Sequence, residues 1–271
     1  MSDLRNRVAL VTGAARGQGR SHAVRLAEAG ANIIALDICA DIDTADYGLG
    51  TEEDLAETEA QIRDTGRQVV ATRADTRDQA ALEQAVADGV AELGRLDIVV
   101  ANAGILTYGK DRPAARFRDA IEVNLIGTWN TLEASVPHIV AGGRGGAVVI
   151  TGSTNGTSGK ASEVSAGARG YTASKHGLVG LMRSYALALG SESIRVSMVS
   201  PTGVNTPMVS LGGESSMAQR VQEVPWDMSN VLPVPLIEAS DVSAAVAWLV
   251  SDEARYVTGV NLAVDAGCAL K

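Results

Sequence analysis

The stretch VALVTGAARGQG, Val8–Gly19, decides the fold of this chain of 271 residues. It begins with the apolar run Val8–Val11, which is typical of a strand buried on both faces, and continues with Gly13, Gly17 and Gly19. Glycines at these positions allow a tight turn from the strand into a helix whose N-terminus can hold an anionic pyrophosphate. Such a turn needs glycine even without a ligand, so the surrounding sequence has to show whether a nucleotide binds there.

Strand and helix patterns alternate along the rest of the chain. Six further short runs predict buried parallel strands: Asn32–Leu36, Gln68–Thr72, Asp97–Val100, Ala147–Ile150, Arg195–Val199 and Asn261–Val264. Amphipathic helical patterns lie between them, and three of these stop before a glycine: Ser21–Ala29, Glu52–Thr65 and Asp78–Leu93. The alternation predicts an α/β fold with a doubly wound, parallel, seven-stranded sheet and helices on both faces, which binds ligands at the carboxyl ends of its strands.

The composition bounds the possible function classes. The chain is 46% hydrophobic and 20% charged and has no Pro/Ser-rich linker, so we expect one domain over residues 1–271. A net charge of −9 disfavours nucleic acid and anionic membrane as partners and leaves small molecules and proteins. The N-terminus lacks a signal-peptide core, and no apolar run has the length of a membrane span, which predicts a soluble cytoplasmic protein. Cys39, Cys268 and the three histidines lack metal-ligand spacing, so no metal site is expected.

Asp37 ends the second strand, roughly twenty residues after the glycine turn. A carboxylate at this point would bind the adenosine ribose diol and repel a 2′-phosphate, which favours NAD over NADP. Arg16 argues the other way, because a guanidinium beside the glycines could pair with that phosphate. No basic residue follows Asp37 to neutralise it, so we expect Asp37 to dominate and Arg16 to pair with nearby carboxylates. A simple loop-capping role for Asp37 remains open.

Tyr171 and Lys175 predict a site for proton transfer. They are four positions apart on one helix, so they share a face, and an ammonium beside the phenol would lower the pKa of Tyr171. A tyrosine tuned in this way acts as an acid or base near neutral pH. Ser153 lies at the end of an apolar strand, in the sequence Thr151-Gly-Ser-Thr-Asn155, which lacks the last glycine of a serine-hydrolase nucleophile turn.

Taken in order, these motifs resemble the short-chain dehydrogenase/reductase family along essentially the full chain. The matching pieces are the glycine turn, Asp75, Asn102–Gly104, Asn124, Ser153, Tyr171, Lys175 and the turn Pro201–Thr206. The resemblance implies a Rossmann-type fold and hydride transfer to or from NAD. The long loop 38–50 is similar to that of an actinobacterial branch that includes carveol dehydrogenase and enzymes associated with the redox cofactor mycofactocin. The usual Asn-Asn-Ala-Gly motif is changed to Ala101-Asn-Ala-Gly104.

The resemblance also implies roles for single residues. Tyr171 would exchange a proton with the substrate oxygen, Ser153 would hold that oxygen, and Lys175 would tune the phenol and bind the nicotinamide ribose. Asn124, within the predicted helical segment Phe117–Leu132, would hold a water that links Lys175 to solvent. Asp75 can accept from the adenine amino group. The residues expected to surround the cofactor are Gly13, Arg16, Gly17, Gln18, Gly19, Asp37, Ile38, Asp75, Thr76, Asn102, Ala103, Gly104, Tyr171, Lys175, Pro201, Val204 and Thr206.

Two long segments interrupt the alternation of strand and helix. Loop 38–50 is polar and is expected near the cofactor, whereas 209–235 is apolar and is expected to form a lid over the substrate. The insert Asn155–Arg169 is expected to reshape the substrate pocket. The apolar segments Ala239–Val250 and Val257–Leu270 resemble the face through which the family forms dimers and tetramers, which predicts a homotetramer.

The leading hypothesis is an NAD-dependent dehydrogenase for a hydrophobic secondary alcohol, such as a cyclic or terpenoid one. Two alternatives stay open: a ketone reductase of other scope, for example for a carrier-bound acyl group, and an NAD-binding sensor without catalysis. If loop 38–50 covers the adenosine half, NAD would stay bound through the cycle and need an external electron acceptor.

Overall fold

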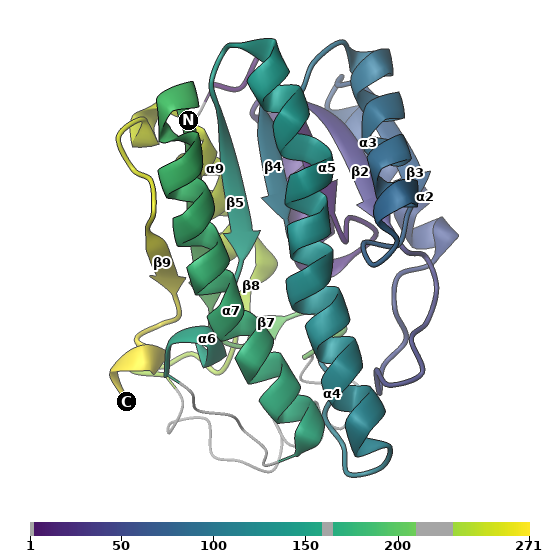
Figure 1. Cartoon of the computed structure of the whole chain (residues 1–271), viewed down its shortest axis with the longest axis vertical. Coiled ribbons are helices and arrows are strands. Elements are labelled where there is room, and N and C mark those ends of the chain that lie inside the picture. The colour runs from purple at the N-terminus through teal and green to yellow at the C-terminus, as the bar shows by residue number, and fades with distance from the viewer. Residues whose placement is uncertain (1–2, 159–164, 210–229) are drawn as a thin grey trace.

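A seven-stranded, fully parallel sheet forms the centre of the computed structural model, which describes residues 3–158, 165–209 and 230–271 (Figure 1). The strands follow the order β3-β2-β1-β4-β5-β6-β9, which confirms the predicted doubly wound fold. Their bounds are β1 (Val8–Thr12), β2 (Asn32–Asp37), β3 (Val69–Arg73), β4 (Ile98–Ala101), β5 (Gly146–Thr151), β6 (Ile194–Pro201) and β9 (Asn261–Val264). A separate parallel pair is formed by β7 (Val204–Asn205) and β8 (Ile237–Glu238).

Helices cover both faces of the sheet. One face carries α3 (Gln79–Leu93), α5 (Gly127–Gly142) and α7 (Ala166–Leu189), and the other carries α1 (Gly17–Glu28), α2 (Glu52–Asp64) and α9 (Ala239–Val250) (Figure 1). Two short helices, α4 (Pro113–Ile121) and α6 (Asn155–Ser158), lie near the carboxyl ends of the strands. Ala9 and Val11 of β1 pack in the core that contains Leu26 of α1, whereas Val8 and Leu10 pack in the core on the opposite face. Because both faces of β1 are buried, the strand is apolar throughout.

Local side-chain caps explain where several helices begin. Helix α2 starts after Thr51, whose hydroxyl accepts from the Asp54 amide while the Asp54 carboxylate accepts from the Thr51 amide. At the start of α3, the Asp78 carboxylate accepts from the Ala81 amide. Helix α1 begins at Gly17, four residues before the predicted start, and its preceding residue, Arg16, makes no side-chain cap. The N-terminus of α1 therefore keeps backbone N–H groups without a side-chain cap.

The predicted helical segment Phe117–Leu132 is not one regular helix. It comprises the end of α4, a π-helical turn over Glu122–Ile126 and the start of α5. A π-turn contains one extra residue per hydrogen-bonded ring, which shifts the side chains after it around the helix axis. The sequence pattern does not reveal this turn, which carries Asn124 at its centre.

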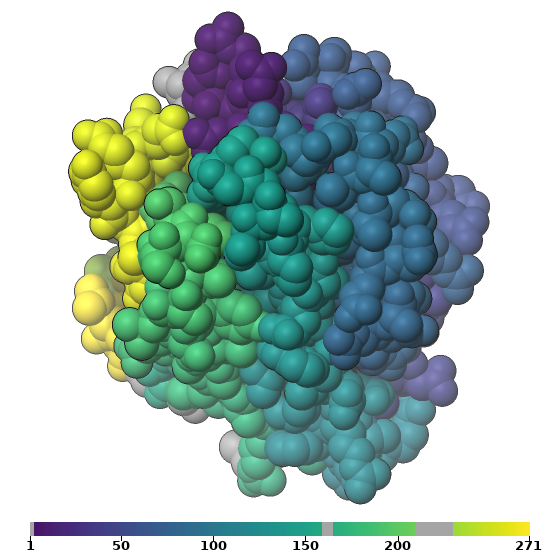
Figure 2. All heavy atoms as spheres, turned by 45° about the horizontal axis from the view of Figure 1, so that its top comes forward, coloured from purple at the N-terminus to yellow at the C-terminus, as the bar shows by residue number. Residues whose placement is uncertain are grey.

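The two ends of the chain lie at opposite edges of the sheet: the N-terminal residues are on the side opposite the ligand-binding edge, and the C-terminus lies on the side of the ligand-binding edge (Figure 1). Figure 2 shows the first residues, in purple, against late residues, in yellow, and Arg7 Nη2 lies 2.6 Å from Asp252 Oδ1. Within the described ranges, no helix has the length and apolarity needed to cross a membrane. Cys39 and Cys268 are free thiols. The predicted lid 209–235 falls mostly outside the described residues, as does part of the insert 155–169.

Candidate active site

A cavity of about 520 Å³ lies at the carboxyl ends of the strands. Its wall combines the glycine turn after β1 with the ends of β2, β4, β5 and β6 and the first half of α7. All of the residues predicted for the cofactor and for catalysis line this cavity, with the exception of Asn124. The fold therefore brings together motifs that lie up to about two hundred positions apart in the sequence, as expected at the switch point of a doubly wound sheet.

The glycine turn is shaped to receive an anionic group. Gly17 has a φ of +55°, which favours glycine, and a Cβ atom on Gly19 would lie 1.8 Å from the Gly13 carbonyl oxygen. Thr206 approaches from the end of β7, with its methyl carbon 3.4 Å from where a Gly17 Cβ would lie. Among the described atoms, the buried Oε1 of Gln18 has no hydrogen-bond partner. The uncapped start of α1 and this unpaired oxygen fit a ligand with phosphate and hydroxyl groups.

Asp37 is 8% exposed, lines the cavity and lies between the glycine turn and the start of loop 38–50. Oδ2 accepts from the Ala15 amide and Oδ1 from the Cys39 amide, each at 3.0 Å. Asp37 thus also caps the loop, as the alternative interpretation proposed, but each carboxylate oxygen retains capacity to accept another hydrogen bond. Gly50, at the far end of the loop, returns to the same place: a Cβ there would lie 3.2 Å from Asp37 Oδ1.

Arg16 does not pair with a carboxylate as predicted. Its guanidinium donates to the Gly48 carbonyl and lies 5.9 Å from the centre of the Tyr47 ring. The reason is local: loop 38–50 folds back over the start of α1 and presents a carbonyl and an aromatic face rather than its acidic side chains. Arg16 consequently joins the loop to the glycine turn.

Two predicted cofactor residues have partners within the protein. Asp75 accepts from the Arg77 side chain at 2.6 to 3.1 Å. Burial opposes ionisation of Asp75, but these hydrogen bonds outweigh it and hold the pKa of its carboxyl below the ordinary value. Asn102 donates to the Thr12 carbonyl at 3.0 Å and accepts from the Thr151 hydroxyl at 3.2 Å. Asn102 therefore ties the ends of β1, β4 and β5 together, and the adenine contact of Asp75 stays a prediction.

Tyr171 and Lys175 lie on one face of α7, inside the cavity. Lys175 Nζ is 5.6 Å from the centre of the Tyr171 ring and donates to the Thr151 carbonyl at 2.8 Å. Burial lowers the pKa of Lys175 to about 8. The Ser153 hydroxyl is hydrogen-bonded to the Tyr171 phenol and also accepts from the Asn155 amide at 3.2 Å. The three side chains thus form a connected group around one point of the cavity wall.

The pKa of Tyr171 differs from the sequence expectation. Burial raises it to about 12, the hydrogen bond from Ser153 opposes this rise, and the neighbouring Tyr108 adds to it. The predicted lowering by Lys175 is therefore wrong for the protein alone. The physical reason is that both groups leave water together, and burial disfavours the phenolate and the ammonium alike. With a pKa of about 8, Lys175 still carries its charge at neutral pH, whereas the Tyr171 phenol stays protonated.

Asn124 lies behind the cavity wall and is fully buried. Its Oδ1 accepts from the Ile105 amide at 2.8 Å, and its Nδ2 donates to the Ile105 carbonyl at 3.0 Å and to the Ser174 hydroxyl at 3.4 Å. In this arrangement the side chain fixes the segment that follows β4. The water that Asn124 was expected to hold stays a prediction.

Sequence reasoning missed an apolar part of the cavity. Leu106 and Tyr108, from the segment after β4, form a cluster with Ala168 of α7, and Tyr47, Tyr171 and Met208 pack against it. The residues of this cluster that line the cavity are Tyr47, Leu106, Tyr108, Tyr171 and Met208. Tyr47 is the aromatic residue in the acidic loop 38–50, and that isolation was the available signal.

With this geometry in place, comparisons with known proteins assign the chain to a family. A family model described as enoyl-(acyl carrier protein) reductase matches residues 13–269. The chain belongs to the short-chain dehydrogenase/reductase family, as its motifs predicted.

Within this family, the chain is similar to carveol dehydrogenases and to other dehydrogenases of actinobacteria. The chain is 44% identical to (−)-trans-carveol dehydrogenase of Rhodococcus erythropolis, with all of both chains covered. It is 47% identical to carveol dehydrogenase from Mycobacterium avium, solved in complex with NAD, with a TM-score of 0.91 and both chains fully covered. A short chain dehydrogenase from Mycobacterium paratuberculosis bound to NAD is 41% identical, with a TM-score of 0.90 over 99% of this chain and 100% of the other. The predicted resemblance to the actinobacterial carveol dehydrogenase branch is thereby confirmed.

Proposed function

We propose that the protein oxidises a hydrophobic secondary alcohol, such as a cyclic or terpenoid one, with Tyr171 as the acid/base and NAD as the hydride acceptor. One observation carries this proposal: the phenol of Tyr171, hydrogen-bonded to Ser153, lies against the apolar cluster of Leu106, Tyr108 and Met208. The same cavity contains the glycine turn and Asp37. A proton acceptor, an apolar substrate wall and a dinucleotide cradle therefore share one space.

The predicted enzyme class and cofactor are confirmed by the comparisons: the protein is an NAD-dependent short-chain alcohol dehydrogenase. The glycine turn would hold the pyrophosphate, Asp37 the adenosine ribose, and Lys175 the nicotinamide ribose. Pro201, Val204 and Thr206 would border the nicotinamide. When bound, NAD supplies the electrophilic ring that takes a hydride from the alcohol carbon.

The chain's own residues would handle the proton. The alcohol would lose a hydride to the oxidised cofactor and its hydroxyl proton to the phenolate form of Tyr171, which would become the neutral phenol, and a ketone would be left. The Ser153 hydroxyl orients the alcohol oxygen toward the phenol, which converts a random encounter into a fixed geometry. The Thr151 carbonyl holds Lys175 Nζ in place, so that the ammonium stays beside the phenol and the cofactor ribose.

The test is replacement of Tyr171 by phenylalanine, with alcohol turnover followed by the absorbance of reduced NAD. Tyr171→Phe should lose roughly 10²–10⁴-fold in kcat while NAD binding stays near that of the wild type, because only the proton acceptor is removed. Ser153→Ala should lose turnover in the same direction. Tyr256→Phe, at a side chain that is 90% exposed and outside the cavity, is the matched control. Unchanged turnover in Tyr171→Phe would overturn the acid/base role.

Two other functions can be distinguished from this one by experiment. The family model's description favours reduction of a carrier-bound acyl group, but the chain's net charge of −9 is unfavourable for docking an acidic carrier. Comparing kcat/KM for a carrier-bound ketoacyl substrate and for a cyclic alcohol discriminates between these activities. A non-catalytic NAD-binding sensor would have no need for Tyr171, Lys175 and Ser153 to converge. Tight NAD binding without turnover on a broad alcohol panel would favour the sensor.

We further propose that NAD stays bound through the cycle and passes its electrons to an external acceptor, such as mycofactocin. Support comes from loop 38–50, which starts beside Asp37 and folds over the start of α1 through the contact between Arg16 and Gly48. Ready loss of NAD on dialysis, combined with normal turnover with free NAD, would contradict this.

The proposal also covers the oligomeric state of the protein and its location in the cell. We propose a homotetramer in the cytoplasm. The exposed Trp248 and Leu270 in the C-terminal segments support the predicted subunit contacts, because large apolar side chains on a surface favour burial in an interface. Light scattering after size exclusion tests the assembly, and a monomer mass would contradict it.

A further inference from the structure

We propose that Tyr47 is a specificity-determining residue for the alcohol and that Arg116 positions it. This inference rests on the proposed function, because it concerns the substrate half of the same cavity. The loop after the second strand of a doubly wound sheet serves the adenosine side of a dinucleotide. Here, loop 38–50 also reaches the substrate side, since Tyr47 packs against the same cluster as Tyr171.

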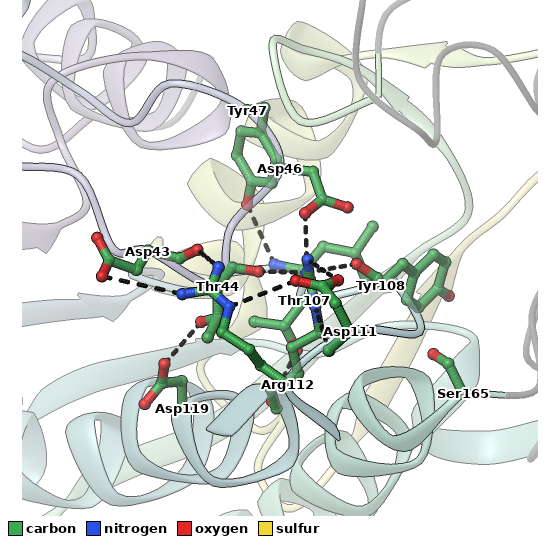
Figure 3. Close-up of polar contacts among 12 residues, drawn as sticks. Asp43, Thr44, Asp46, Tyr47, Thr107, Tyr108, Asp111, Arg112, Asp119 and Ser165 are labelled. Atoms are coloured by element: carbon green, nitrogen blue, oxygen red, sulfur yellow. Dashed lines mark hydrogen bonds and ion pairs between the residues drawn. The ribbon is translucent and has the colours of Figure 1, made fainter. Parts of the chain in front are cut away.

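The position of Tyr47 is fixed by its hydroxyl group. Tyr47 Oη accepts from the Leu106 amide at 3.1 Å, so the phenol is joined to the segment that follows β4 (Figure 3). Burial raises the pKa of Tyr47, which keeps the hydroxyl neutral at physiological pH. The ring therefore serves as a rigid, uncharged surface beside Tyr171.

Arg116 holds the loop that carries Tyr47. Its side chain is 6% exposed, and its Nη1 donates to the Thr44 carbonyl at 2.7 Å and to the Tyr108 carbonyl at 2.5 Å. The same nitrogen lies 2.8 Å from Asp46 Oδ1, and Nη2 donates to Asp111 Oδ1 at 2.8 Å. Thr44 and Asp46 belong to loop 38–50, whereas Tyr108 and Asp111 follow β4. One buried guanidinium thus fastens the two segments together.

The backbone at Gly109 packs closely against the Arg116 guanidinium, so that a larger residue at position 109 would collide with it. Gly109 has a φ of +136°, and a Cβ atom there would lie 2.7 Å from Arg116 Cζ. Two further contacts tie the loop to α4: the Thr44 hydroxyl donates to Asp119 Oδ2 at 2.6 Å, and Arg112 donates to the Asp43 carbonyl (Figure 3). The loop is therefore attached beside the substrate region as well as at its two ends.

The consequence concerns substrate shape. Arg116 bonds to the backbone of Tyr108 and to residues one and three positions before Tyr47, so it sets the position of both rings relative to Tyr171. Two rigid aromatic side chains present flat surfaces whose contact with a ring loses little conformational freedom. A cyclic secondary alcohol fits such a wall better than a flexible open-chain alcohol, which must be ordered on binding.

The experiment compares cyclohexanol with an open-chain secondary hexanol in wild-type protein and in Tyr47→Leu, Tyr47→Phe and Arg116→Lys. Tyr47→Leu should reduce the ratio of the two kcat/KM values about tenfold, mainly through KM, because the aromatic surface is lost. Tyr47→Phe keeps the ring and should change the ratio less. Arg116→Lys keeps the charge but loses the planar fork, and should shift the ratio toward that of Tyr47→Leu. Controls are Tyr256→Leu and, on the surface of α2, Arg63→Lys.

The outcomes separate this inference from the proposed function. If the wild type turns over alcohols and Tyr47→Leu leaves the ratio unchanged, the inference is overturned and the proposed function stands. If the wild type oxidises no secondary alcohol, the proposed function fails. The inference is then decided by calorimetric binding of cyclohexanone and an open-chain hexanone to the NAD-loaded protein. Loss of the preference for the ring in Tyr47→Leu supports the inference, and an unchanged preference overturns it.

Discussion

Asn124 and Ile105 hold each other through two reciprocal hydrogen bonds, of 2.8 and 3.0 Å, in which the side-chain amide of Asn124 binds the backbone N–H and carbonyl of Ile105. The Asn124 side chain thus donates and accepts in the same way as the backbone of a neighbouring strand would. It holds the segment that follows β4 in a fixed position. Since Asn124 is fully buried in the π-turn, water cannot replace either bond.

Replacing Asn124 by alanine should destabilise the protein by roughly 2–5 kcal/mol, because two buried backbone groups of Ile105 lose their partners. Turnover should fall as well, since the segment after β4 lines the cavity. Urea unfolding followed by circular dichroism measures the stability. Asn205→Ala, which removes a contact with Glu238 at an exposed position, is the control and should cost well under 1 kcal/mol. Equal stability of the two variants would refute the role given to Asn124.

Asp37→Asn should weaken the preference for NAD over NADP by roughly 10–100-fold. The substitution removes the negative charge that would repel a 2′-phosphate and weakens the hydrogen bonds to the ribose. Dissociation constants for both dinucleotides provide the measurement. Asp64→Asn removes the same charge from an exposed position at the end of α2 and should leave the preference unchanged. If Asp37→Asn behaves in the same way as Asp64→Asn, then Asp37 only caps the loop.

The pKa of Tyr171 should fall when oxidised NAD binds. In the protein alone it is raised to about 12, chiefly by burial, and a positive nicotinamide ring beside the phenol would favour the phenolate. Because alcohol oxidation requires the basic form, the rate should rise with pH through the lowered pKa. Ultraviolet difference titration of the wild type against Tyr171→Phe, with and without NAD, isolates this one phenol from the other tyrosines. An identical titration in both states would contradict the expectation.

His22 should make the protein less stable in mild acid. The ring is buried between α1 and α9, with Nδ1 2.8 Å from the Ser243 hydroxyl, and burial lowers its pKa from 6.5 to about 3. Between these values the unfolded chain binds a proton that the folded protein does not. This contribution to stability is therefore complete above about pH 6.5 and is lost as the pH falls toward 3, by up to about 1.4 kcal/mol per pH unit.

Unfolding free energies of wild type and His22→Gln across this pH window provide the measurement. The slope should be smaller in His22→Gln, whereas the exposed His176→Gln should retain it. Equal slopes in all three proteins would show that His22 is not responsible.

The features that the sequence predicts correctly are those governed by neighbouring residues. The seven strands, the glycine turn and the shared face of Tyr171 and Lys175 follow from local periodicity and spacing, so their predicted bounds lie within a few residues of the observed ones. The features that it misses depend on contacts between distant segments. The π-turn at Asn124, the partner of Arg16 and the pKa of Tyr171 arise only when the helix, the loop and the cavity wall meet.

Arg116 illustrates the same limit. Its position in an amphipathic helical pattern predicts an exposed, solvated arginine, and no neighbouring residue in the sequence indicates that it is buried. Its partners come from residues 44, 46, 108 and 111, so its role appears only after loop 38–50 folds onto the segment behind β4. One of the acidic residues of loop 38–50, Asp46, forms an ion pair with this guanidinium.

Loop 38–50 also has an evolutionary consequence. It leaves the sheet at Asp37 and ends at the capping box of Thr51, so its two ends are held by β2 and by the start of α2. Lengthening a stretch of this loop between two of its fixed contacts adds only about 0.6 kcal/mol of closure entropy per doubling. Insertions and deletions at this place can therefore alter which molecules the enzyme accepts while the register of the seven strands stays intact. Changes in the length of this loop could therefore alter the substrate range of the enzyme during evolution while each variant still folds.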